Sequence, residues 1–283
     1  MIFLSCPKIT DAHPIIPLIL RHRTLQKLQT TYVNGLLEAV SADGRIHSTL
    51  LQHGTTTGRF ASKDPNLQNI PNKSDEGRRI RDAFIASPGM KLVALDYSQI
   101  ELRIAAMLSG DNNLLEIFKN NRDIHTEVAA AVFEKPSDEV TKDDRRKAKV
   151  INFGILYGMG VNALRGNLGG ETTRSDAQQY LDQYFTAFSG LATWIQDIKN
   201  FAHHHKFTET MFGRKRLFPE ISSRIPMVRT HAERAAVNAP IQGTQADMIK
   251  IAMVQIDGWL KHKKLTDEAR LLLQIHDELV YEI

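Results

Sequence analysis

Strand-like segments stand far apart in this sequence, and their separation most constrains the fold. Residues 91–97 (KLVALDY) form a compact apolar run after a Pro-Gly pair, which predicts a buried strand. Near the C-terminus, 270–275 and 278–283 have the pattern of two strands joined by a polar turn. Between these segments, 100–206 is mainly helical in pattern. The sequence therefore predicts an α+β fold, in which distant segments build one sheet around a large helical insertion.

Local patterns predict the remaining elements. Apolar spacing predicts a helix over 14–39, followed by a turn at 42–44 and a short alternating run over 45–51. The segment 54–77 is rich in Gly, Thr, Asn, Pro and Asp, which indicates an ordered loop. A hairpin is predicted over 208–217, and two helices are predicted over 227–239 and 244–261.

Composition narrows the class of protein. Hydrophobic residues make up 42% and charged residues 24%, as in ordinary soluble proteins, and the net charge of +4 is too small to indicate a nucleic-acid partner. The single cysteine, Cys6, excludes an internal disulfide and a cysteine-based zinc site. No run approaches the ~18 apolar residues of a membrane span. We expect an intracellular, cytoplasmic protein with no membrane partner.

Carboxylates stand at the ends of the predicted strands. Asp96 closes the apolar run, and Asp277 with Glu278 occupies the tip of the C-terminal hairpin. Each also fits an ordinary role, because a strand end or a turn favours aspartate for backbone reasons. Together they could hold two divalent cations ~3.5–4 Å apart, the arrangement that serves in-line phosphoryl transfer. Oxygen ligands favour magnesium over zinc.

A second pattern lies in 145–158 (RRKAKVINFGILYG). Arg145, Lys149, Phe153 and Tyr157 are each four residues apart, so that on a helix they form one stripe. Two cations followed by two aromatic rings could bind a triphosphate and stack a base beyond it. The same spacing also fits a surface helix with solvated cations and aromatic rings in the core.

These motifs resemble family A DNA polymerases over about residues 13–283. The segment 96–103 (DYSQIELR) resembles the family's motif A, 145–158 its motif B, and 274–278 (QIHDE) its motif C. Two pairs of segments are similar to its template–primer contact regions: 57–59 with 64–71, and 233–238 with 242–244. The resemblance implies a right-hand palm with an antiparallel sheet and mainly helical fingers. The thumb is expected to be largely absent.

The resemblance implies the catalytic machinery. Asp96 and Asp277 would bind two Mg²⁺ ions, for which Mn²⁺ could substitute, with the Tyr97 carbonyl as a further ligand. Glu278 would lie beside this site in a less critical role. The metals would activate the primer 3′-hydroxyl and neutralise charge on the reacting phosphate.

By the same resemblance, the second pattern would bind the incoming nucleotide. Arg145, Lys149 and His125 would contact the triphosphate, and Lys149 would also protonate the departing pyrophosphate. An ordinary helix-surface histidine is the alternative for His125. The sugar, base and template-base positions would be formed by Phe153, Tyr157, Gln99 and Glu101, of which Glu101 would exclude a ribose 2′-hydroxyl.

DNA contacts are implied at Arg59, Arg234, Asn238, Gln242 and His276. They would follow the minor groove and the sugar–phosphate chain without reading sequence. The expected partners are primer–template DNA and dNTPs, and the chain is expected to act as a monomer.

The expected domains are 1–103 (N-terminal helix, template–primer loop and motif A), 104–226 (fingers) and 227–283 (remaining palm with motif C). The expected reaction adds dNMP from dNTP to a primer 3′-hydroxyl and releases pyrophosphate. With little thumb, synthesis should be distributive. Three alternatives stay open: a truncated DNA-binding remnant, a two-metal nuclease and a single-subunit RNA polymerase.

Overall fold

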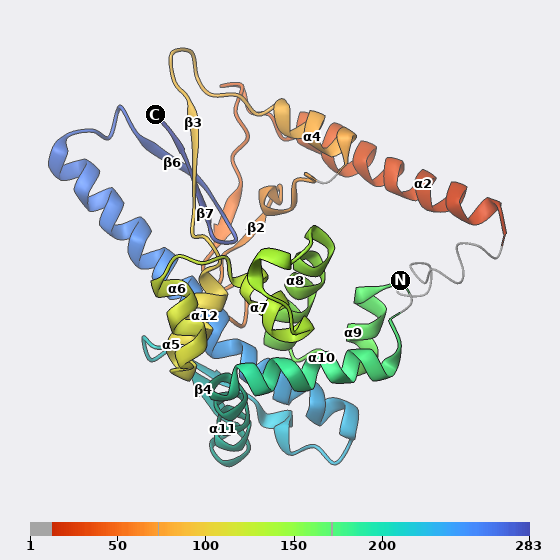
Figure 1. Cartoon of the computed structure of the whole chain (residues 1–283). Helices are drawn as coiled ribbons and strands as arrows, with labels where there is room; N and C mark the ends of the chain where they lie inside the picture. Colours follow the sequence, from red (N-terminus) through yellow and green to blue (C-terminus); the bar gives the residue numbers. More distant parts are fainter. Residues whose placement is uncertain (1–12, 73, 171) are drawn as a thin grey trace. The chain divides into compact units, whose positions relative to one another are not determined.

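The computed structural model describes residues 13–72, 74–170 and 172–283 (Figure 1). These residues form two compact units. The first comprises 13–55, 60–96 and 257–283, and the second comprises 56–59 and 97–256. None of the helices in the described ranges has both the length and the apolar character needed to cross a bilayer.

The first unit is built around a three-stranded antiparallel sheet, drawn in yellow and blue in Figure 1. Its strands are β3 (Leu92–Asp96), β6 (Arg270–Ile275) and β7 (Glu278–Glu282), and β7 lies in the middle. Asp96 is paired directly with Glu278 in this register. The predicted sheet of distant segments is therefore confirmed.

The prediction that β3 is a buried strand was wrong. Leu92 and Leu95 of this strand are 40% and 50% exposed, whereas Leu279 and Tyr281 of β7 are buried. The side chains of β3 alternate between the two faces of the sheet and stay largely exposed on both, whereas β6, the other edge strand, is mostly half-buried. An apolar run predicts a strand by its length and composition, but it does not show whether other elements cover the faces of that strand.

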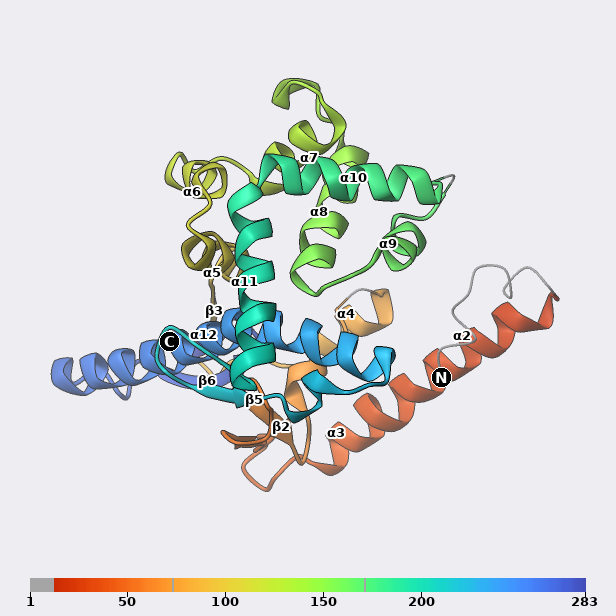
Figure 2. The ribbon, with the colours of Figure 1, turned by 90° about the horizontal axis from the view of Figure 1, so that it is seen from below.

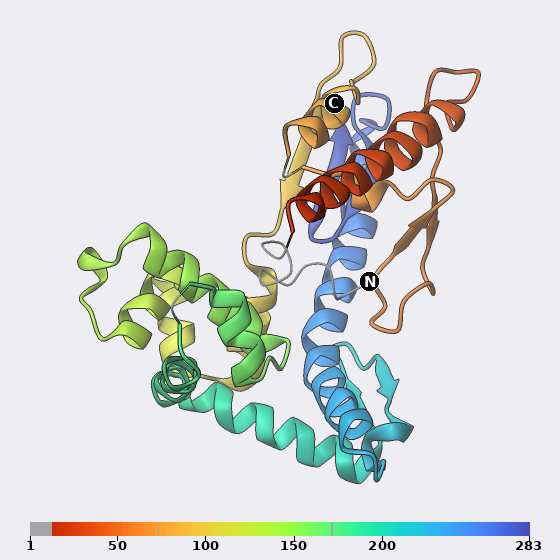
Figure 3. The same cartoon turned by 90° about the vertical axis from the view of Figure 1, so that its right-hand side faces the viewer.

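The rest of the first unit comes from the N-terminal segments. Its elements are α2 (Ile15–Lys27), the π-helical η2 (Leu28–Asn34), α3 (Gly35–Glu38), β1 (Thr49–Leu51), β2 (Ala61–Lys63), η3 (Leu67–Asn69) and α4 (Asp75–Asp82). The helix predicted over 14–39 is confirmed. Helix α2 lies beside α4, and an ion pair between Arg21 of α2 and Glu76 of α4 joins them (Figures 1 and 3). The expected loop contains β2, which pairs with β1 through its backbone. Its central residue, Ser62, is buried and contacts the hydroxyl of Ser48 just before β1, a polar contact that carries no apolar signal.

The second unit is mainly helical, as predicted for 100–206. Its helices are α5 (Ile100–Ser109), α6 (Asn112–Lys119), α7 (Ile124–Phe133), α8 (Lys142–Leu156), α9 (Val161–Leu168), α10 (Arg174–Ala187) and α11 (Ser189–His205), with the short turns η4 (Ser137–Glu139) and η5 (Pro219–Ser222). Figure 2 shows α8 flanked by α7 and α9, with α10 crossing them. Fully buried Val128, Ile151, Leu164 and Tyr184 join these helices in one core.

The long helix α12 (Pro226–Lys263) replaces the two helices predicted over 227–239 and 244–261. Proline at position 240 has no N–H, so the carbonyl of Ala236 loses its helical partner. The hydroxyl of Thr208 donates a hydrogen bond of 3.2 Å to that carbonyl. Thr208 lies on β4 (Phe207–Glu209), which forms the predicted hairpin with β5 (Lys215–Leu217). The hairpin thus supplies the contact that lets the helix continue through Pro240.

Candidate active site

The two candidate metal-binding carboxylates lie in the first unit. Asp96 is the last residue of β3, and Asp277 lies in the two-residue turn between β6 and β7, after His276 with its left-handed φ of 56°. Burial, and then the negative charge of Asp277, raise the pKa of Asp96. Among the described residues neither side chain has a hydrogen bond or an ion pair. Two like charges are thus held near each other without a neutralising partner.

Two glutamines support the turn that carries Asp277. The buried Gln274 donates a hydrogen bond of 2.6 Å from its Nε2 to the carbonyl of His276. Gln68 of η3 in turn donates to the backbone carbonyl of Gln274 at 3.1 Å. Both glutamines lie in segments that resemble family motifs, but neither was predicted to support the turn; a polar residue at a buried strand position is the signal that could have found Gln274.

The donor set at this place fits an oxygen-bound divalent cation. No group of three or more His, Cys, Asp or Glu side chains within the described ranges is arranged to hold a metal. Mg²⁺, however, is commonly bound by one or two carboxylates, with water and substrate phosphates completing its shell. A cation between Asp96 and Asp277 would remove the repulsion that raises the pKa of Asp96.

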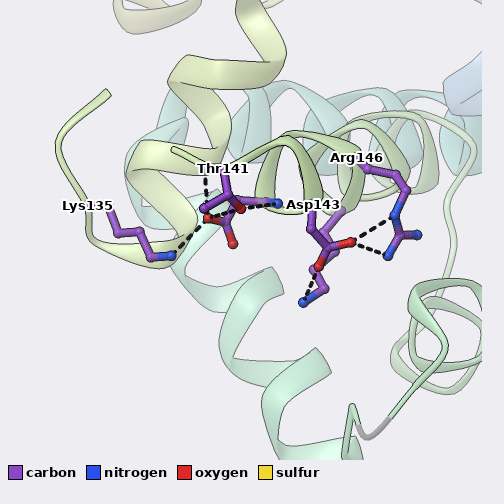
Figure 4. A network of polar contacts seen from close by, with 6 residues as sticks. Lys135, Thr141, Asp143 and Arg146 are labelled. Carbon is purple, nitrogen blue, oxygen red and sulfur yellow. Dashed lines mark hydrogen bonds and ion pairs between the residues drawn. The ribbon is translucent and has the colours of Figure 1, made fainter. Parts of the chain in front are cut away.

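In the second unit, the start of α8 is fixed by a capping box (Figure 4). The Thr141 hydroxyl accepts from the backbone N–H of Asp144 at 3.1 Å, and the Asp144 carboxylate accepts from the N–H of Thr141 at 3.1 Å. Lys135 also donates to Asp144, at 2.9 Å. Asp143 accepts from Arg146 and Lys147 at 2.7 and 2.9 Å. A single carboxylate of the first turn, Asp143, therefore neutralises two of the cations that follow.

The cations of the predicted stripe differ in their partners. Arg145 makes two hydrogen bonds, of 2.8 and 2.9 Å, to Asp123, the capping residue of α7. Burial alone would raise the pKa of Asp123, but the guanidinium of Arg145 and hydrogen bonds from Thr126 lower it to about 2. Among the four cations in 145–149, only Lys149 has no carboxylate partner within the described part of the chain. Lys149 is exposed, so its ammonium is the one available to an anion.

The aromatic half of the stripe continues towards the end of α8. The rings of Phe153 and Tyr157 are stacked, with centroids 6.4 Å apart and planes inclined by 15°. Phe153 packs against the core of the unit, while Tyr157 is partly exposed. His125 of α7 lies 5.9 Å from Phe153, and its side chain is buried. The alternative of an ordinary surface histidine is therefore wrong.

A buried carboxylate joins the end of α8 to the start of α5. Glu101 accepts a hydrogen bond of 2.6 Å from the hydroxyl of Tyr157, and its other oxygen forms an ion pair with Arg59. Arg59 also donates from Nε to the buried Gln245 at 3.2 Å. Gln99 precedes α5 with a left-handed φ of 56°. Glu101 thus gains the partners that a buried charge requires.

The predicted DNA contacts of α12 share one face. Arg234, Asn238 and Gln242 are four residues apart on this helix. A side chain at Gly158 would place its Cβ 2.6 Å from Cγ of Arg234, and Gly158 has a positive φ of 66°, so both space and backbone require glycine there. Gln245 was missed by the sequence analysis, although it lies only three residues beyond Gln242.

Known proteins resemble the chain over nearly its whole length. The family model for DNA polymerase family A matches residues 5–283. DNA polymerase I of Pseudomonas aeruginosa is 47% identical over 94% of the chain, and the thermostable DNA polymerase I of Thermus aquaticus is 46% identical over 97%. The chain spans 29% and 32% of the length of these two relatives.

A solved structure shows the same fold. The POL domain of Pol1 from M. smegmatis, in complex with DNA primer-template and dNTP, has a TM-score of 0.91 and 44% sequence identity to the chain. The match covers 96% of this chain and 47% of that one. The palm-and-fingers fold class expected from the motifs is thereby confirmed. The chain belongs to DNA polymerase family A.

Proposed function

We propose that the chain catalyses template-directed DNA synthesis, in which dNMP is transferred from dNTP to a primer 3′-hydroxyl and pyrophosphate is released. The observation that carries the proposal is the pair of carboxylates Asp96 and Asp277, which lie close together without a partner among the described residues. Family membership supports it, as does the solved relative that was captured with DNA primer-template and dNTP.

The carboxylates are proposed to hold two Mg²⁺ ions, with the Tyr97 carbonyl as a further ligand and Mn²⁺ as a substitute. When bound, these ions lower the pKa of the attacking hydroxyl and neutralise charge on the reacting phosphate. The contribution of the protein is to hold Asp96 and Asp277 in place before any cation arrives. Glu278, directly opposite Asp96 in the sheet, adds negative charge beside the pair.

On α8, Lys149 is the proposed first contact of the triphosphate, because its ammonium has no carboxylate partner in the described ranges. It is also the proposed proton donor to the departing pyrophosphate. Arg145 now donates two N–H groups to the carboxylate of Asp123. On binding a nucleotide, it would donate the same two groups to phosphate oxygens instead. His125 is proposed as a further phosphate contact.

The sugar and base are proposed to pack on Phe153. Tyr157 would occupy the template-base position until a nucleotide binds, held there by its hydrogen bond to Glu101. Glu101 would exclude a ribose 2′-hydroxyl, and Gln99 would contact the nucleotide from the start of α5. A buried, fixed carboxylate suits a steric gate because it cannot move aside without losing its partners.

Primer–template DNA is proposed to bind along Arg234, Asn238 and Gln242 of α12, at Arg59 and at His276. Polar side chains four residues apart form a continuous face that can follow a minor groove. We expect the chain to act as a monomer. The proposed functional division assigns 104–226 to the fingers, and 1–103 with 227–283 to the palm.

Primer extension tests the proposal. A recessed primer–template, dNTPs and Mg²⁺ would be incubated with the unmodified chain and with Asp277→Asn, after circular dichroism has shown that both fold. We expect extension by the unmodified chain and none by the variant. Binding of DNA by a folded chain without extension would instead support the DNA-binding remnant. Degradation of the primer without dNTPs would support the nuclease, and preferential use of rNTPs the RNA polymerase.

A further inference from the structure

A buried polar pair joins α7 to α8 beside the predicted triphosphate contacts. His125 is 4% exposed and Asn152 is 0% exposed. The side-chain nitrogen of Asn152 lies 3.1 Å from Nδ1 of His125. The other end of this amide, Oδ1, is buried without a hydrogen-bond partner among the described residues. Asn152 therefore makes its single side-chain hydrogen bond to the histidine.

The orientation of the Asn152 amide decides which nitrogen of the ring carries a proton. As placed, the amide leaves its carbonyl oxygen and one of its two N–H donors without a partner among the described residues. Turned by 180°, it would accept from Nδ1–H and leave two N–H donors buried without partners. Orphaned N–H groups in protein interiors are rarer than under-satisfied carbonyls. The observed orientation is thus favoured, and in it Nδ1 of His125 accepts a hydrogen bond.

A histidine whose Nδ1 accepts carries its proton on Nε2 when neutral. Burial lowers the pKa of His125; the charge of Asp123 raises it, and the charges of Arg145 and Lys149 lower it again. The net shift is downward, which favours the neutral ring. These are the charged groups on α7 and α8 that act on the ring. In the Nε2–H tautomer the neutral ring can donate a hydrogen bond from Nε2 without taking up a second proton.

We propose that Asn152 is a positioning residue that holds His125 in the Nε2–H tautomer, so that Nε2–H donates to a phosphate oxygen of the incoming dNTP. This inference rests on the proposed function for its ligand. The tautomer itself is a property of the free protein and is measured without any substrate.

The first measurement is a two-bond ¹H–¹⁵N correlation spectrum of the ¹⁵N-histidine-labelled chain, with the His125 signals identified from their loss in His125→Gln. We expect the Nε2–H pattern in the unmodified chain and a mixture of tautomers in Asn152→Leu. Nδ1–H in the unmodified chain would overturn the proposal, even if the variant does not fold. An unchanged Nε2–H pattern in folded Asn152→Leu would also overturn it, because the amide would not then set the tautomer.

The second measurement is a double-mutant cycle on the KM for dNTP in primer extension. Asn152→Leu should raise KM about two- to threefold, because a mixture of tautomers leaves only part of the chains with Nε2–H, and should change kcat less. In the His125→Gln background the same substitution should have little further effect, because the glutamine amide donates without a tautomer. Asn200→Asp, on exposed α11, is the control for a general effect and should match the unmodified chain. Full additivity of the two substitutions would overturn the proposed coupling.

If neither the unmodified chain nor any variant extends a primer, the proposed function fails while the tautomer remains testable. The two failures are therefore distinguishable.

Discussion

Two aspartates in the two units show how differently a carboxylate can be used. Asp123 binds a guanidinium and caps a helix, and its pKa is lowered to about 2. Asp96 faces the charge of Asp277 with no such partner among the described residues, and its pKa is raised by burial and by that charge. The charge of Asp123 is neutralised by a guanidinium of the same unit. A carboxylate with a raised pKa and no such partner among the described residues is typical of a site whose partner arrives from outside.

The sharpest test of this contrast is Asp96→Asn. We expect the rate of primer extension to fall on the order of 10³-fold, because Asp96 is proposed to bind a metal ion and a metal ligand supplies several kcal/mol in the transition state. A raised folded pKa means that the charged form costs some stability above that pKa, but the side chain of Asp96 is exposed and screened by water, so the unfolding temperature of the variant at pH 7 should equal that of the unmodified chain or lie slightly above it. Asp267→Asn, a 97% exposed aspartate of the same unit, should change neither quantity. A loss of stability together with activity would indicate a structural carboxylate instead.

The contrast extends to cations on α8. Lys149→Ala should lower kcat/KM for dNTP by about 10- to 100-fold, as expected for one charge-assisted hydrogen bond. Lys147→Ala is the matched control, because Lys147 is paired with Asp143 and lies two residues away. Steady-state kinetics of single-nucleotide addition would measure both. Equal losses of kcat/KM in the two variants would show that the net charge of α8 decides dNTP use, and that the absence of a carboxylate partner at Lys149 does not.

Tyr157→Phe removes one hydrogen bond from the carboxylate of Glu101 and leaves all charged groups in place. The hydroxyl of Tyr157 donates to buried Glu101, so its removal should lower the free energy of unfolding by about 1 kcal/mol. Chemical denaturation would measure the change, with Tyr180→Phe as the control. A stability equal to that of the unmodified chain would mean that Arg59 alone satisfies Glu101.

A further prediction concerns Asp123→Asn and pH. The lowered folded pKa of Asp123 contributes stability that is present above the unfolded value of about 3.9 and is lost as pH falls towards 2. The difference in unfolding free energy between the parent and the variant should therefore be constant from pH 5 to 7 and shrink below about pH 4. Denaturant titrations at several pH values would measure it. A difference that persists at pH 2 would assign the effect to the helix cap rather than to the ion pair.

Much of the fold could be read from local patterns. The strand ending at Asp96, the C-terminal hairpin and the helices of 100–206 follow from periodicity and turn residues, which are local properties of the chain. The break predicted between 239 and 244 is absent, because the effect of Pro240 on α12 depends on Thr208, a residue on another element. The exposure of β3 was missed for a similar reason, since the elements that cover the faces of a strand come from elsewhere in the chain.

The sequence by itself determined the family, the order of the motifs and the stripe on α8, because each of these is written in residue type and spacing. Only the tertiary structure decided which of those residues have partners. The members of each contacting pair are well separated in the sequence, and no local pattern links them: Arg145 with Asp123, His125 with Asn152, and Arg59 with Gln245. The physical reason is that hydrogen bonds and ion pairs act over a few ångströms in space, and neighbours in space are chosen by the packing of the elements that carry them.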